Sequence, residues 1–121
     1  MYCFELDCYE RAVRTEDRRQ ETCIINCYVH LGFELAQRCN TASETKNVYL
    51  RLVSTLEETF CDPLLSKLWR QKSYRVIKQI LPVIYEMTNK REYTALAKRL
   101  STLSEYFLDN QPQQQSQFNK R

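Results

Sequence analysis

The side chains that most invite a chemical interpretation are six cysteines and a single histidine. Cys23, Cys27 and His30 stand four and three positions apart. In a helix they would project from one side, where Cys39 could complete a tetrahedral metal site. Zinc fingers, however, place their paired cysteines in a turn, whereas this pair lies within a predicted helix. We therefore predict no metal site, and no motif in the chain implies a cofactor.

The even number of cysteines also fits the disulfide framework of a secreted protein. Such frameworks are typical of small, loop-rich chains, while this chain is dense in helical patterns. Cysteines 8, 39 and 61 fall on or beside predicted apolar stripes, as small buried thiols do. We favour free thiols and keep a secreted, disulfide-bonded helical protein as an alternative. The pattern leaves all six open: Cys3, Cys8, Cys23, Cys27, Cys39 and Cys61.

Acid–base catalysis has little support in the sequence. His30 is the one side chain whose ordinary pKa lies near neutrality. Glu57 and Glu58 are adjacent, so on a helix they point about 100° apart and cannot act as a paired acid and base. We predict that the protein is not an enzyme and assign no catalytic residue.

The elements that must position any site are helices. The 121 residues contain one glycine, Gly32, which argues against β-architectures and phosphate-binding loops, since both depend on glycine. Apolar residues recur at three- and four-residue steps along most of the chain. We predict an all-α fold, a compact bundle of five to six helices in a single domain at residues 1–108. Residues 109–121, rich in glutamine, should form a disordered tail.

Capping residues and prolines define the expected boundaries. One long helix is predicted over 16–39, and Thr41 with Glu44 and Asn89 with Glu92 form capping boxes for helices near 42–60 and 90–108. Residues 48–53 also alternate as a strand would, but the helical stripe continues beyond them. Pro63 predicts the start of a short helix to about residue 72, and a further helix from residue 73 should be bent or divided at Pro82.

Charge is distributed unevenly along the chain. Residues 1–63 carry 7 basic and 11 acidic side chains, whereas residues 64–99 carry 9 basic and 2 acidic ones. The overall charge of +3 therefore hides a strongly basic second half. In this half, cations are interleaved with Trp69 and Tyr74, a composition suited to acidic partners.

We predict a non-enzymatic interaction module, an adaptor or regulatory subunit. It would bind an acidic, amphipathic segment of another protein through a basic helical surface that contains aromatic residues. A nucleic-acid-binding protein that uses the same patch is the alternative. The predicted partner-binding residues, with Trp69 or Tyr74 as an exposed apolar anchor, are Lys67, Trp69, Arg70, Tyr74, Arg75, Lys78, Lys98 and Arg99.

The sequence also predicts where the protein works. No apolar run is long enough to span a membrane, and the acidic N-terminal segment does not resemble a secretory signal. We expect an intracellular protein of the cytoplasm or nucleus with no membrane contact. The apolar stripes are wide for a small bundle, which is compatible with a homo-oligomer.

Residues 84–100 are similar to the last helix of KIX domains, three-helix modules that bind acidic activation segments. The shared positions are Tyr85, Glu86, Asn89, Arg91, Glu92, Tyr93, Leu96 and Ala97. The resemblance implies that Tyr93, Leu96 and Ala97 line a ligand groove. It requires a one-residue gap, Ser101 stands where an aromatic residue is expected, and the first 48 residues have no counterpart. We do not assign the chain to this family, and the predicted surface does not depend on the resemblance.

Overall fold

A computed structural model describes residues 3–19 and 23–109 and confirms the all-α fold with five α-helices. The strand alternative at 48–53 is excluded because these residues are helical. Apart from Asp109, the predicted tail lies outside the described residues. The helices are α1 (Phe4–Arg14), α2 (Ile24–Gln37), α3 (Ala42–Phe60), α4 (Lys67–Tyr85) and α5 (Lys90–Ser104), followed by a π-helical turn, η1 (Glu105–Asp109).

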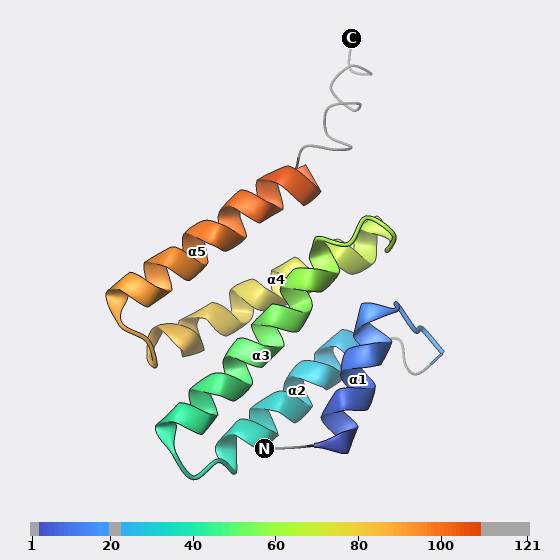
Figure 1. Cartoon of the computed structure of the whole chain (residues 1–121). Helices are drawn as coiled ribbons and strands as arrows, with labels where there is room; N and C mark the ends of the chain where they lie inside the picture. Colours follow the sequence, from blue (N-terminus) through green and yellow to red (C-terminus); the bar gives the residue numbers. More distant parts are fainter. Residues whose placement is uncertain (1–2, 20–22, 110–121) are drawn as a thin grey trace.

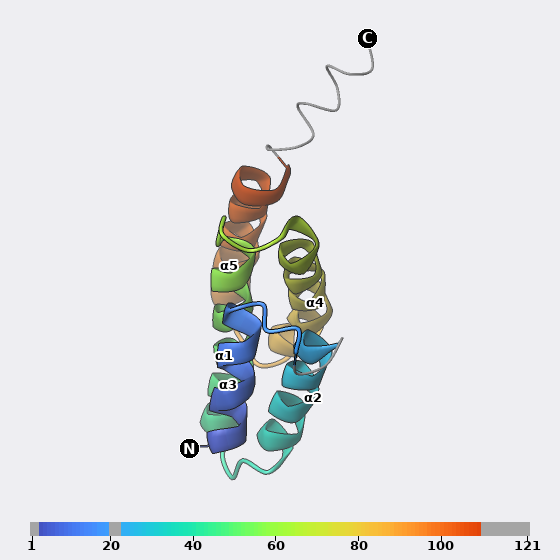
Figure 2. The same ribbon diagram turned by 90° about the vertical axis from the view of Figure 1, so that its right-hand side faces the viewer.

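The helices pack in two layers around the central pair α3 and α4. Figure 1 shows α1 and α2 on one side of this pair and α5 on the other. In the view turned by 90°, α1, α3 and α5 form one layer, and α2 and α4 form the second (Figure 2). All five helices contribute to one hydrophobic core, whose largest fully buried side chains are Tyr28, Phe60, Leu6, Ile24, Ile25, Leu52, Leu56, Ile77, Ile80, Ile84, Leu100 and Val13.

The single glycine lies where α2 crosses α3. A Cβ atom built on Gly32 would stand 2.5 Å from Leu52 Cδ2 and 2.7 Å from Leu52 Cδ1, well inside van der Waals contact. Leu52 is itself fully buried, so it has little freedom to move away. Glycine is therefore required at position 32 for these two helices to approach so closely.

Two predicted helix boundaries are wrong. The helix expected over 16–39 begins only at Ile24, after a loop in which Glu16 has a positive φ of 55°. The helix expected at Pro63 begins at Lys67, because Asp62 Oδ1 accepts a hydrogen bond from Leu64 N (2.9 Å) in a turn and Ser66 takes the N-cap position.

The break expected between residues 72 and 73 is also absent. Helix α4 is one helix of 19 residues rather than two. Pro82 stands in its last turn, where the lost hydrogen bond would have gone to the carbonyl of Lys78. Lys78 lies on the exposed face of α4, so water can satisfy this carbonyl and the helix continues to Tyr85.

A half-buried ionic cluster joins the first three helices. Glu10 of α1 accepts hydrogen bonds from Tyr28 Oη of α2 (2.7 Å) and from Arg51 Nε of α3 (2.6 Å). The guanidinium of Arg51 also contacts Asp7. The hydrogen bonds to Glu10 hold the pKa of Arg51 above its usual value, while burial raises the pKa of Tyr28. Both side chains therefore keep their protons throughout the physiological pH range.

The loop after α1 is fixed to the start of α4 by Glu16. Its carboxylate accepts hydrogen bonds from Ser66 N (2.8 Å), Ser66 Oγ (2.7 Å) and Arg18 Nη2 (2.6 Å). Because Ser66 is the N-cap of α4, this negative charge lies at the positive end of the helix dipole. These bonds offset the cost of a backbone conformation that residues other than glycine rarely adopt.

Acid should weaken this contact. Burial alone would raise the pKa of Glu16, but the hydrogen bonds from Ser66 and Arg18 outweigh it and hold the pKa below its usual value. The stabilisation is therefore complete above about pH 5 and is lost as the pH falls through the folded-state pKa. We expect Glu16→Gln to lower the free energy of unfolding at neutral pH by about 1–2 kcal/mol and to flatten its decline in acid.

Urea denaturation from neutral pH down to about pH 3 measures this effect. Glu34→Gln, at an exposed position of α2, is the matched control and should follow the wild-type pH dependence. A Glu16→Gln variant with the same acid-induced decline as the wild type would contradict the prediction.

Two ion pairs at the protein surface connect the last helix, α5, to α3. Leu100 and Ser104 are the residues of α5 that are buried. Lys46 Nζ of α3 binds Glu92 Oε1 at 3.0 Å, and Glu57 Oε1 of α3 accepts a hydrogen bond from Arg99 Nη2 at 2.7 Å. Ion pairs of this exposure contribute little each. Among the five helices, α5 has the fewest buried residues.

Candidate partner-binding surface on α4

Helix α4 positions six of the eight predicted partner-binding residues. It begins after Ser66, whose hydroxyl accepts a hydrogen bond from Trp69 N (3.3 Å), and its buried side faces α3. Lys98 and Arg99, the remaining two, lie on α5. The structure divides the eight residues into buried, paired and free groups.

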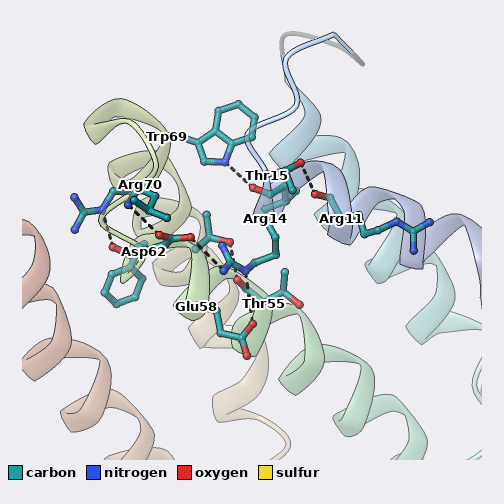
Figure 3. A network of polar contacts seen from close by, with 12 residues as sticks. Arg11, Arg14, Thr15, Thr55, Glu58, Asp62, Trp69 and Arg70 are labelled. Atoms are coloured by element: carbon teal, nitrogen blue, oxygen red, sulfur yellow. Dashed lines mark hydrogen bonds and ion pairs between the residues drawn. The ribbon is translucent and has the colours of Figure 1, made fainter.

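Trp69 is buried, so its expected role as an exposed anchor is wrong. The side chain is 7% exposed, and its indole Nε1 donates a hydrogen bond to Val13 O at 2.8 Å. Figure 3 shows the indole directed toward the end of α1. Position 69 lies on the same side of α4 as Val76 and Ile80, which places the ring in the core.

Arg70 is also part of the structure rather than a free cation. It is 5% exposed, and its guanidinium donates hydrogen bonds to Phe60 O (Nε, 3.0 Å) and Phe107 O (Nη2, 2.7 Å). Phe60 is the last residue of α3, where carbonyl groups lack helical partners and the helix dipole is negative (Figure 3). Arg70 therefore joins the end of α3 to η1 and is not available to a partner.

The two predicted residues of α5 differ from each other. Arg99 is paired, through Nε (3.2 Å) and Nη2 (2.7 Å), with Glu57 Oε1 of α3. Lys98 is exposed and has no carboxylate partner within the described part of the chain. Lys67, at the first position of α4, is exposed in the same way.

Tyr74, Arg75 and Lys78 come together as the sequence predicts. With three further residues they line a groove of about 500 Å³ between α4 and the C-terminal end of the described chain. Lys78 Nζ lies 5.5 Å from the ring centroid of Tyr74. The Tyr74 ring also forms a T-shaped contact with Phe60, with ring centroids 5.1 Å apart. We call this surface the α4 groove; its residues are Gln71, Tyr74, Arg75, Lys78, Gln79 and Leu108.

The chemistry of the α4 groove is cationic and partly apolar. Within residues 3–19 and 23–109, neither Arg75 nor Lys78 forms an ion pair with a carboxylate. Their charges are therefore available to an external anion. The half-buried ring of Tyr74 offers apolar surface beside them, whereas Leu108 at the groove wall is itself buried. Gln71 and Gln79 offer amide groups.

A second hollow, which the sequence did not indicate, lies on the other side of α4. It encloses about 230 Å³ and is lined by Arg18, Ile25, Leu68, Trp69 and Lys72. Leu68 is 74% exposed and Leu64, in the preceding turn, is 91% exposed. Arg18 reaches this site from the loop after α1, and its guanidinium carbon lies 5.6 Å from the Trp69 ring centroid. The spacing of Leu64 and Leu68, four positions apart among basic residues, is the signal in the sequence that could have indicated this hollow.

Of the three residues that the KIX resemblance places in a ligand groove, Leu96 lines a hollow smaller than the α4 groove, whereas Tyr93 and Ala97 do not line it. This hollow of about 320 Å³ lies between α3 and α5, and Leu50 and Val53 also line it. The cations at its edge, Lys46 and Arg99, are already paired with Glu92 and Glu57. An acidic ligand would gain less there than in the α4 groove, where the cations are free.

The candidate metal ligands do not converge. Across residues 3–19 and 23–109, no three histidine, cysteine, aspartate or glutamate side chains form a group able to hold a metal ion. His30 Nε2 lies 3.3 Å from Glu34 Oε2, and Cys39 Sγ donates to Leu35 O at 3.5 Å. None of the six cysteines forms a disulfide. Burial and the nearby charge of Glu57 raise the pKa of Cys61 to about 11.

Within the described ranges, the helices are too short or too polar to cross a bilayer. Comparison of the chain with protein-family models, with curated proteins and with solved structures finds no match.

Proposed function

We propose that the protein is a non-enzymatic interaction module that binds an acidic, amphipathic segment of another protein in the α4 groove. The observation that carries this proposal is the pair of unpaired cations, Arg75 and Lys78, beside the half-buried ring of Tyr74. A carboxylate of the partner would pair with these cations, while an apolar side chain would cover the ring of Tyr74.

Several sequence-based expectations belong to this proposal. It includes an adaptor or regulatory role and a location in the cytoplasm or nucleus, and cysteines that form no disulfide are compatible with that location. Lys67 and Lys98 would add long-range attraction for an acidic partner. The location is tested by counting the free thiols of protein that is purified from its natural source and denatured without reductant. A secreted, disulfide-bonded protein would have no free thiols.

A peptide-display selection on the full chain tests the binding function. We expect the enriched peptides to be rich in Asp and Glu, with apolar residues three or four positions apart. Arg75→Glu combined with Lys78→Glu should weaken binding of a selected peptide by about tenfold or more. Lys90→Glu with Arg91→Glu, at the exposed start of α5, is the control because it changes the net charge equally.

Three outcomes would count against the proposal. Enriched peptides without acidic residues, or equal effects of the two double variants, would show that the α4 groove is not the binding site. Tight binding of a DNA or RNA oligonucleotide that falls a hundredfold or more between about 50 and 200 mM salt would favour the nucleic-acid alternative. An interface anchored by apolar burial loses little over the same range.

A further inference from the structure

The start of α2 brings two thiols into contact. The sulfur atoms of Cys23 and Cys27 lie 3.8 Å apart, close to van der Waals distance. Cys23 is exposed to solvent and Cys27 is half-buried. A small disulfide in solution can therefore reach the sulfur of Cys23, and the sulfur of Cys27 already lies beside it.

The backbone of Cys23 is compatible with closer approach. Residues four apart within a helix keep their Cβ atoms about 5–6 Å apart, whereas a disulfide needs about 3.5–4.5 Å. Cys23 is the N-cap residue of α2, with φ −119° and ψ 41°, so its conformation is not fixed by the helix. Rotation at this residue can shorten the distance and leave the later turns of α2 intact. A bond that requires such rotation is easily reduced again.

We propose that Cys23 and Cys27 form a reversible disulfide by exchange with a small disulfide of the glutathione type. The exposed Cys23 loses its proton and attacks one sulfur of oxidised glutathione, which releases the first glutathione thiol. Cys27 then attacks the Cys23 sulfur of the mixed disulfide and releases the second. Two protein thiols are oxidised to one disulfide, and one oxidised glutathione is reduced to two thiols, with protons conserved.

The modification would act on the surface that α1 and α2 share. Cys27 lines a groove of about 420 Å³ together with Tyr9, Leu31 and the acidic residues Glu5 and Glu34. A bond to Cys23 would turn the Cys27 sulfur toward the N-terminus of α2 and change the wall of this groove. The α4 groove shares none of these lining residues, so the proposal does not depend on the proposed function.

The chain provides its own assay. Trypsin cleavage after Arg19 and Arg38 releases peptide 20–38, whose cysteines are Cys23 and Cys27. The reduced full chain is incubated with oxidised glutathione, alkylated and digested. We expect peptide 20–38 to appear unalkylated and lighter by two hydrogens, and to return to the dialkylated form after reduced glutathione is added.

An internal control comes from the same digest. Peptide 1–11 carries Cys3 and Cys8, which are five positions apart and diverge around the helix. Closure of peptide 20–38 should exceed closure of peptide 1–11 by about tenfold or more. In Cys27→Ser the reaction should stop at one glutathione on Cys23. A peptide 20–38 that stays dialkylated in oxidised glutathione, or that closes no faster than peptide 1–11, would overturn the proposal.

Discussion

Replacement of Trp69 by alanine is expected to lower the free energy of unfolding by about 3–5 kcal/mol. The variant removes a large side chain from the core and leaves Val13 O without the hydrogen bond from the indole. The cost therefore combines lost apolar burial, a cavity and the lost indole hydrogen bond, although Val13 O keeps its bond from Glu16 N (3.3 Å). Urea denaturation followed by far-ultraviolet circular dichroism measures it, since the variant lacks the chain's single tryptophan.

Leu68→Ala is the matched control for this variant. Leu68 is the neighbouring residue in α4 but is exposed, so its loss should change the free energy of unfolding by about 0.5 kcal/mol or less. Equal costs for the two variants would contradict the buried position of Trp69. A further consequence concerns binding experiments, because lost binding by Trp69→Ala would report loss of the fold rather than loss of a contact.

Arg70→Ala should be the second most damaging of these changes, at about 3 kcal/mol. It removes two charge-assisted hydrogen bonds, to Phe60 O and Phe107 O, in a nearly dry environment. Lysine should restore little of this loss, because one ammonium group cannot reproduce the fork of a guanidinium that reaches two separate carbonyls. Hydrogen exchange should also quicken in residues 100–108, which the contact with Phe107 joins to α4.

Arg75→Ala provides the comparison with identical side-chain chemistry. Arg75 is exposed on α4 and has no carboxylate partner in the described chain, so its removal should change stability by about 0.5 kcal/mol or less. The two arginines thus separate stability from binding. Fast exchange at the C-terminal end in Arg75→Ala, or its absence in Arg70→Ala, would contradict the placement of Arg70.

Local signals in the sequence predict much of the fold. Both predicted N-caps are present in the structure, as Thr41 Oγ1 accepts from Glu44 N (3.1 Å) and Asn89 Oδ1 accepts from Glu92 N (2.8 Å). The return bonds of a full capping box are not formed, because Glu44 Oε1 accepts from Asn40 N (3.2 Å) and the Glu92 carboxylate binds Lys46. The two N-cap bonds join residues three positions apart, so residue type and spacing determine them. The start of α4 combines local and distant contacts. Ser66 caps Trp69 N three positions later, and Glu16 reaches Ser66 across 50 positions of sequence, which no local pattern indicates.

The site follows the same division between local and distant contacts. Tyr74, Arg75 and Lys78 share the solvent side of one helix, which periodicity reveals without any structure. Trp69 lies on the apolar side of α4, so helical periodicity also indicates its burial. The partners of Arg70, in contrast, are the backbone carbonyls of Phe60 and Phe107. A carbonyl group is present at every residue, so no residue type in the sequence marks these partners.

The crossing of α2 and α3 limits how this sequence can diverge. Every residue other than glycine at position 32 brings a Cβ atom into the space that Leu52 occupies. A substitution there becomes acceptable only after position 52 has become smaller, and a smaller residue at 52 with Gly32 retained leaves a cavity. The two positions should therefore change together among descendants of this protein. The order of the two steps determines whether the intermediate carries a steric clash or a cavity.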